Sequence, residues 1–135
     1  MKRSMAWVVG LTLVAAAAWA DAQNAALDGT RWGLRVSPDA LAQEKGEKEF
    51  VETLSFVNGR IETSAASQRG FEACSYVAAR SGEKDWSFSA DQKSPSQGSF
   101  AWSGTAHGDD LRGKLVWTKP DRSVLTYTFH GDRKK

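Results

Sequence analysis

The stretch from residue 99 to residue 118, SFAWSGTAHGDDLRGKLVWT, constrains the fold more than any other part of the chain. On each side of HGDD the apolar and polar residues alternate strictly, which is typical of a β-strand with one buried face. A two-residue turn at Gly108 and Asp109 would join the two strands, and glycine at the first central position suits a type II′ turn. The stretch therefore predicts a β-hairpin.

The register of this hairpin follows from its apolar residues, because each of them then faces another apolar residue. A slip of one residue would turn a whole strand to the wrong face. Gly104 and Gly113 lie opposite each other on the inward side, and a glycine inside a strand marks a bend, a bulge or a close approach. The predicted pairs are Ala106 with Leu111, Gly104 with Gly113, Trp102 with Leu115, and Phe100 with Trp117.

Similar alternation recurs along most of the chain. Asn58-Gly59 is the strongest short hairpin signal and pairs Phe56 with Ile61. Residues 38–48 form the one region whose composition is typical of a helix, and we expect a lid-like loop or one or two helical turns there. The other predicted loops are 64–70 and 92–97. The other predicted strands are 30–36, 49–57, a short strand after Gly59, 71–79, 85–91 and 123–130.

Eight strands joined mostly by short turns favour an all-β fold, an eight-stranded antiparallel up-and-down barrel. Closure of such a barrel removes exposed sheet edges. A two-sheet sandwich is the alternative. The final strand would place Phe129 opposite Gly113, so that its ring lies over the space that the glycine leaves. Glu52 shares the inward face of its strand, and we expect it at the barrel rim, since burying it unpaired would be costly.

Residues 1–20 have the features of a secretory signal peptide. Lys2 and Arg3 precede an apolar segment, and Ala18-Trp19-Ala20 resembles a cleavage site. The apolar run is too short for a stable membrane anchor. We therefore predict cleavage after Ala20, a single domain over residues 21–135, and a periplasmic or secreted location.

The charge balance gives no sign of a nucleic-acid partner. The chain has 18 Lys and Arg against 16 Asp and Glu, and residues 1–20 hold two of the basic residues and no acidic one. The rest is therefore balanced at 16 against 16, whereas nucleic-acid binding calls for a basic stripe. A single cysteine, Cys74, excludes an intrachain disulfide, and we expect it to be a small buried residue.

The segment LDGTRW at residues 27–32 resembles the opening of the lipocalins and the wider calycin group. The chain is most similar to the small exported lipocalin-like proteins of bacteria. In lipocalins a tryptophan near the first strand closes the base of the barrel, and a basic residue after the last strand packs over it. The resemblance implies these roles for Trp32 and Arg133.

The interior of an eight-stranded barrel is either filled by side chains or holds one small ligand. A packed aromatic core and an aromatic-lined pocket both fit the inward residues, and the inward glycines favour the pocket. We expect non-catalytic binding of a small apolar or aromatic ligand. The candidate ligand-binding residues are Trp86, Phe88, Phe100, Trp102, Gly104, Gly113, Trp117, Tyr127 and Phe129.

The alternative is an exported protein-binding or inhibitor module that acts on a hydrolase through the barrel-end loops 37–49 and 91–98. Catalysis has little support, because His107, Asp109 and Asp110 sit in a tight turn where Gly and Asp are expected anyway. The sequence shows no pair of metal ligands at a set spacing. We therefore expect no enzyme activity, no cofactor and no metal.

Overall fold

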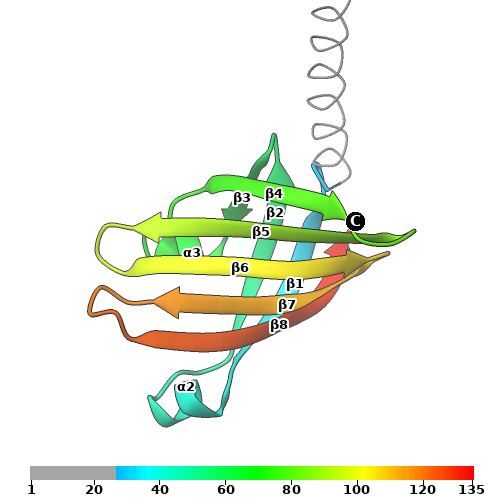
Figure 1. Cartoon of the computed structure of the whole chain (residues 1–135). Coiled ribbons are helices and arrows are strands. Elements are labelled where there is room, and N and C mark those ends of the chain that lie inside the picture. Colours follow the sequence, from blue (N-terminus) through cyan, green and yellow to red (C-terminus); the bar gives the residue numbers. More distant parts are fainter. Residues whose placement is uncertain (1–26) are drawn as a thin grey trace, which may run out of the picture.

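The computed structural model describes residues 27–135, and the predicted signal peptide lies outside them. Eight antiparallel strands form one closed barrel, in which each strand pairs with the next and β8 pairs with β1 (Figure 1). The predicted up-and-down barrel, the architecture of lipocalins, is confirmed, and the sandwich alternative is wrong. The strands are β1 (Arg31–Pro38), β2 (Phe50–Val57), β3 (Arg60–Thr63), β4 (Cys74–Arg80), β5 (Asp85–Ser94), β6 (Gly98–His107), β7 (Asp110–Thr118) and β8 (Val124–Lys134).

The hairpin of β6 and β7 pairs in the predicted register, with Gly104 opposite Gly113. Gly108 has a φ of 59°, as the first central position of a type II′ turn requires. The turn between β2 and β3 has positive φ at both Asn58 (52°) and Gly59 (76°), which is the type I′ pattern. Local turn chemistry therefore sets the register of both hairpins.

Phe129 on β8 lies opposite Gly113 and packs over both inward glycines. A Cβ atom added at Gly113 would lie 2.7 Å from Cζ of the Phe129 ring, and one added at Gly104 would lie 2.9 Å from it. The aromatic ring thus occupies the space that a side chain on either glycine would need. The predicted placement of Phe129 over Gly113 is confirmed.

Two short helices interrupt the strands at one end of the barrel. The first, α2 (Ala40–Glu44), lies in the expected lid-like loop, and Asp39 caps it by accepting a hydrogen bond of 2.9 Å from the backbone N–H of Ala42. The second, α3 (Ala65–Gln68), replaces part of the predicted loop 64–70. Helix α2 lies below the strands in Figure 1 and packs on the barrel through the fully buried Ala42.

Glu52 on β2 is the reason that α3 forms. Glu52 lies near the end of the barrel that α3 covers, where a rim position was predicted, but its side chain is fully buried there. The carboxylate accepts hydrogen bonds from the backbone N–H groups of Ser64, Ala65 and Ala66 and from the Ser64 hydroxyl, at 2.6–2.9 Å. These are donors that the first turn of a helix leaves unpaired. The buried charge is therefore compensated, and in turn it fixes the helical turn.

Strand β5 is longer than predicted and runs on to Ser94. Gln92 and Ser94 are buried there, although polar residues were expected to lie in a loop. The predicted loop 91–98 is therefore reduced to a tight turn before β6. Among residues 27–135 no helix is long and apolar enough to cross a membrane.

The barrel is least tightly paired between β3 and β4, where only Arg60 with Ser75 and Ile61 with Cys74 are in register. Cys74 is half-buried and packs against the core. Burial raises the pKa of its thiol above the ordinary value, so the reactive thiolate is disfavoured. The prediction of a buried small residue is met in part.

Candidate functional site

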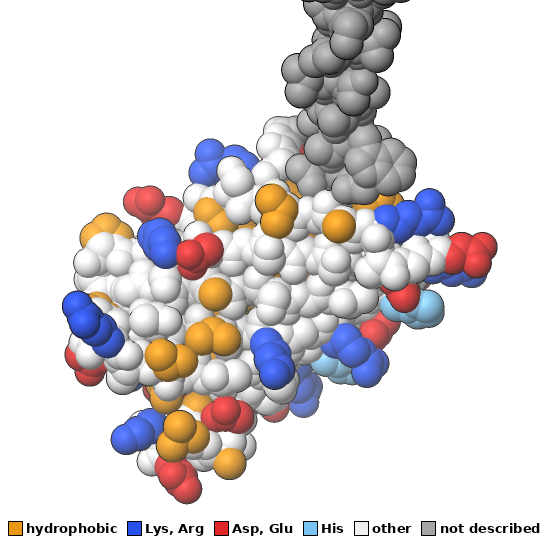
Figure 2. All heavy atoms as spheres, in the orientation of Figure 1, with side chains coloured by type: hydrophobic (Ala, Val, Ile, Leu, Met, Phe, Trp, Pro, Cys, Tyr) orange, Lys and Arg blue, Asp and Glu red, His pale blue; other side chains and the backbone are white. Residues whose placement is uncertain are grey.

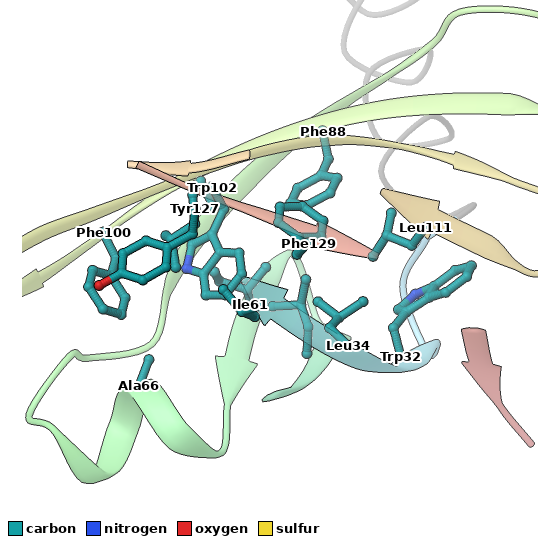
Figure 3. Packing of buried hydrophobic residues seen from close by; sticks show 14 of the residues in the cluster. Trp32, Leu34, Ile61, Ala66, Phe88, Phe100, Trp102, Leu111, Tyr127 and Phe129 are labelled. Carbon is teal, nitrogen blue, oxygen red and sulfur yellow. The ribbon is translucent and has the colours of Figure 1, made fainter. Parts of the chain in front are cut away.

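Five of the candidate ligand-binding aromatics lie together in the barrel interior, each with at most 4% of its surface exposed. Rings from different strands meet there in edge-to-face contacts, such as Trp102 on β6 with Phe129 on β8 at 5.4 Å between ring centroids (Figure 3). Phe88 and Phe129 are 6.3 Å apart, and both approach Gly104. The structure thus brings the central part of the predicted site together as a packed cluster. Its aromatic members are Phe88, Phe100, Trp102, Tyr127 and Phe129.

The polar atoms of the interior are already paired within the protein. The indole N–H of Trp102 donates to Oε1 of Gln92 at 2.7 Å. The Gln92 amide in turn donates to the Thr63 hydroxyl and to the Glu72 carbonyl, at 3.1 and 3.2 Å. Among residues 27–135 no buried side-chain nitrogen or oxygen lacks a partner. The interior therefore presents no free polar group to orient a ligand.

One end of the barrel, which we call the mouth, is closed by residues 64–73. Ala66 of α3 is fully buried, and Phe71 stacks on Phe100 with ring centroids 3.8 Å apart. Figure 3 shows α3 lying against the interior cluster, with Ala66 pointing toward it. The hydrogen bonds that residues 64–66 donate to the Glu52 carboxylate hold this mouth segment in place. Entry of a ligand would require the segment to move.

Cations and aromatic rings form the outer rim of the mouth. The Arg69 guanidinium lies over two rings, at 5.1 Å from the centroid of Phe50 and 5.7 Å from that of Trp117. The Lys119 ammonium lies over Trp117 from another side, at 4.7 Å. Trp117 also donates its indole N–H to the Gln97 carbonyl at 2.7 Å. Trp117 therefore lies at the mouth edge of the interior cluster, where its ring also meets Phe100 with centroids 5.6 Å apart.

The loop that carries α2 is tied to the barrel by a short hydrogen bond. The Tyr127 hydroxyl donates to Oε1 of Glu47 at 2.5 Å. Burial, followed by this hydrogen bond, holds the pKa of Tyr127 above its ordinary value. On the same loop Leu41 is 55% exposed. A fixed loop that carries an exposed leucine thus projects from the mouth.

Trp86 lies at the opposite end of the barrel, which we call the base, and is separate from the rest of the predicted site. A hollow of about 200 Å³ opens there, with Trp32 on another side. Trp32 is buried and directly opposite Arg133 in the pairing of β1 with β8, and both line the hollow. This arrangement agrees with the roles that the resemblance to lipocalins implies for the two residues.

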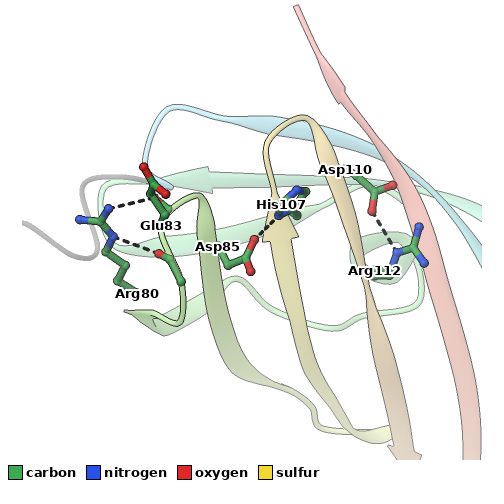
Figure 4. Close-up of polar contacts among 7 residues, drawn as sticks. Arg80, Glu83, Asp85, His107, Asp110 and Arg112 are labelled. Carbon is green, nitrogen blue, oxygen red and sulfur yellow. Dashed lines mark hydrogen bonds and ion pairs between the residues drawn. The ribbon is translucent and has the colours of Figure 1, made fainter.

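The predicted acid–base candidates lie outside the barrel and are exposed or half-exposed. Nδ1 of His107 pairs with Oδ1 of Asp85, and Asp110 pairs with Arg112 at 3.0 Å (Figure 4). His130, which is exposed on β8, lies 3.2 Å from Asp110. No group of three metal-ligating side chains occurs among the described residues. These are polar contacts on the surface, and exposed contacts of this kind add little to stability.

The outer wall carries a wide, shallow hollow of about 590 Å³ over β6–β8, lined mainly by Thr105, Arg112, Lys114, Thr128 and His130. Figure 2 looks onto the outer face of β5–β8, where uncharged side chains and backbone cover much of the centre. The hollow is open to solvent and has no buried polar group aimed into it. We therefore do not regard this hollow as a binding site, and the two ends of the barrel remain the candidates.

Comparison with known proteins finds no family model, no curated protein and no solved structure that matches this chain. The functional interpretation therefore rests on its own residues. Sequence reasoning missed the mouth segment and the role of Glu52. A carboxylate on the apolar face of a predicted strand needs buried donors to compensate it, but the sequence does not show that residues 64–66 supply them.

Proposed function

We propose that this chain is an exported, non-catalytic binding protein that contacts a protein partner through the loop of residues 39–49 at the barrel mouth. The observation that supports this proposal is the packed centre of the barrel, where Phe129 takes up the space beside both inward glycines. A barrel whose centre is packed in this way can still bind a partner through its ends. Function in such scaffolds concentrates in loops that a rigid framework positions.

The loop has the form of a small docking element. Asp39 caps α2, and the Tyr127–Glu47 hydrogen bond fixes the return of the chain to β2. This ordering in advance lowers the entropy cost of binding. Leu41 supplies the exposed apolar contact. A narrow projecting loop fits a concave partner surface, and we therefore propose an exported hydrolase, held at its active-site cleft, as the partner class.

Export is part of this proposal, and it is supported by the signal-peptide features of residues 1–20. N-terminal sequencing of the protein from the periplasmic fraction or the medium tests it. We expect the sequence to start at Asp21. Recovery of the chain only in the cytoplasm, with Met1 retained, would refute export and leave the binding proposal to be tested separately.

Affinity capture with Leu41→Asp tests the docking loop. We expect the unaltered protein to retain an exported hydrolase and inhibit it, and Leu41→Asp to lose both. Val77→Asp is the matched control, because Val77 is 65% exposed on β4, away from the mouth. Equal capture and inhibition by the protein and by Leu41→Asp would show that the loop is not the contact.

A second candidate function is binding of a small apolar or aromatic ligand inside the barrel. It is favoured by the position of the aromatic cluster, which is covered at the mouth by the single segment 64–73. Phe71 of this segment stacks on Phe100. A ligand would then replace residues 64–73 at the mouth. Native mass spectrometry of protein from its own host tests this. A retained small molecule that is lost in Phe100→Ala supports it, and a ligand-free mass refutes it.

A further inference from the structure

The base hollow lies between two tryptophans and is far from the mouth loop. Trp32 is buried, with its indole N–H donating to the Thr30 hydroxyl at 2.9 Å, and Trp86 is half-buried. The hollow measures about 200 Å³, smaller than the roughly 300–1,000 Å³ of sites for drug-sized molecules. It suits a single ring. Its lining is Leu27, Thr30, Trp32, Lys84, Trp86, Ala106, Gly108 and Arg133.

Two cations and no carboxylate line this hollow. Among residues 27–135 neither Lys84 nor Arg133 makes a side-chain ion pair or hydrogen bond. Three aspartates of the same end have other partners, and Figure 4 shows two of these pairs. Asp85 pairs with His107, Asp110 pairs with Arg112 and His130, and Asp109 lies 3.9 Å from Lys135.

Trp86 adds an unused hydrogen-bond donor. Three of the four tryptophans between residues 27 and 135 donate their indole N–H to an acceptor in the protein. Trp86 has no such acceptor among these residues. Since none of their buried side-chain nitrogens is unpaired, the Trp86 N–H is open to solvent. It is therefore available to an oxygen of a ligand.

The parts of the hollow are held in place by the backbone. Arg80 donates to the carbonyls of Gly82 and Glu83, at 3.1 and 2.9 Å, and so fixes the turn that carries Lys84 (Figure 4). The backbone N–H of Arg133 donates to the Asp109 carbonyl at 2.9 Å. These contacts fix the backbone that carries both cations beside the hollow, and such preorganisation favours affinity.

We propose that the base hollow binds a small aromatic carboxylate. The ring would pack against Trp32 and Trp86, as aromatic rings do in offset or edge-to-face contact. The carboxylate would lie between Lys84 and Arg133 and accept the Trp86 indole N–H, and bonds of this kind between charged groups are the stronger ones. The site is independent of the mouth loop.

Titration with benzoate, followed by the indole resonances in a ¹H–¹⁵N spectrum, tests the proposal. We expect the Trp86 resonance to shift with a single saturable dissociation constant of about 1 mM or tighter, and the Trp117 resonance at the mouth to stay in place. Acetate lacks the ring and benzyl alcohol lacks the charge, so each should bind at least about tenfold more weakly.

Charge variants distinguish specific binding of benzoate in the hollow from general attraction of anions to the protein. Lys84→Gln and Arg133→Gln should each weaken benzoate binding by about tenfold. Lys119→Gln removes one charge at the other end of the barrel and should leave binding unchanged. Equal weakening by all three variants, or an unmoved Trp86 resonance at millimolar benzoate, would overturn the proposal. If Arg133→Gln fails to fold, the comparison of benzoate binding by Lys84→Gln and by its control Lys119→Gln decides the result.

Discussion

The two ends of this barrel are closed in different ways. At the mouth, residues 64–73 fold inward, the buried Glu52 carboxylate satisfies their N–H groups, and Phe71 stacks on the interior cluster. At the base, Trp32 closes the interior but leaves a hollow beside it, with Lys84 and Arg133 unpaired among the described residues. At the mouth the buried polar groups hold the closing segment in place. At the base two cations remain available to a ligand.

This difference separates stability from recognition. Removing a group at the mouth or in the interior leaves a buried partner or a cavity, and either of these is costly. Removing a cation at the base leaves nothing buried. Substitutions of Glu52 and of the interior rings should therefore affect folding strongly, whereas substitutions of Lys84 and Arg133 should affect only binding.

Phe129→Ala should have the largest effect on folding. It empties the space between Gly104 and Gly113, and loss of a core phenylalanine lowers the free energy of unfolding by about 3–5 kcal/mol. Urea unfolding measures this change. Thr128→Ala, which alters the exposed neighbour, should stay within about 0.5 kcal/mol. Equal effects of the two variants would contradict a filled interior.

Glu52→Gln should loosen the mouth. A neutral amide cannot accept all the hydrogen bonds that the carboxylate receives, and we expect a loss of about 2–4 kcal/mol in the free energy of unfolding. Hydrogen exchange should accelerate first at residues 64–66. Glu62→Gln on β3, where the side chain is exposed, is the control and should change little. Unchanged protection of residues 64–66 would show that Glu52 does not hold the mouth segment.

Tyr127→Phe tests the tie between the mouth loop and the barrel. Loss of the hydrogen bond to Glu47 should cost about 1 kcal/mol at neutral pH. Because folding raises the pKa of Tyr127, its stabilising effect is complete below about pH 10 and is lost as the pH rises further. Tyr76, whose pKa is also raised, adds to the same fall. The variant should therefore lose less stability than the unaltered protein above pH 10, and an identical fall would contradict this account.

The smallest effects should come from the cations at the two ends. Arg69→Gln removes the contacts with Phe50 and Trp117 and should cost about 0.5–1 kcal/mol. Lys84→Gln should leave thermal unfolding unchanged within about 0.5 kcal/mol while weakening benzoate binding. A larger stability loss for Lys84→Gln than for Arg69→Gln would contradict the account, in which the mouth cation stabilises the fold and the base cation serves binding.

The alternation of residues predicts most of this fold, because a strand with one buried face leaves little freedom in register. The Gly104–Gly113 pairing, the turns at Asn58 and Gly108, and the position of Phe129 all follow from local pattern and turn chemistry. The closure of the mouth does not follow from pattern. It depends on Glu52 meeting N–H groups at residues 64–66, and no local signal links segments that meet only in the folded barrel.

The predicted binding residues show the same limit. Alternation identifies which side chains point inward, and the interior aromatics do meet there. It does not give their height along the barrel, so Trp86 at the base and Trp117 at the mouth were grouped with them. Whether the interior is hollow depends on how the rings interlock, and this is a property of three-dimensional packing.

Diffraction from crystals pressurised with xenon tests the central claim, that the interior is filled and recognition occurs at the ends. Xenon enters empty apolar cavities inside proteins. We expect no xenon atom among Phe88, Trp102 and Phe129 in the unaltered protein, and a clear site there in Phe129→Ala. Xenon bound at that position in the unaltered protein would show that the barrel is hollow and would contradict the account.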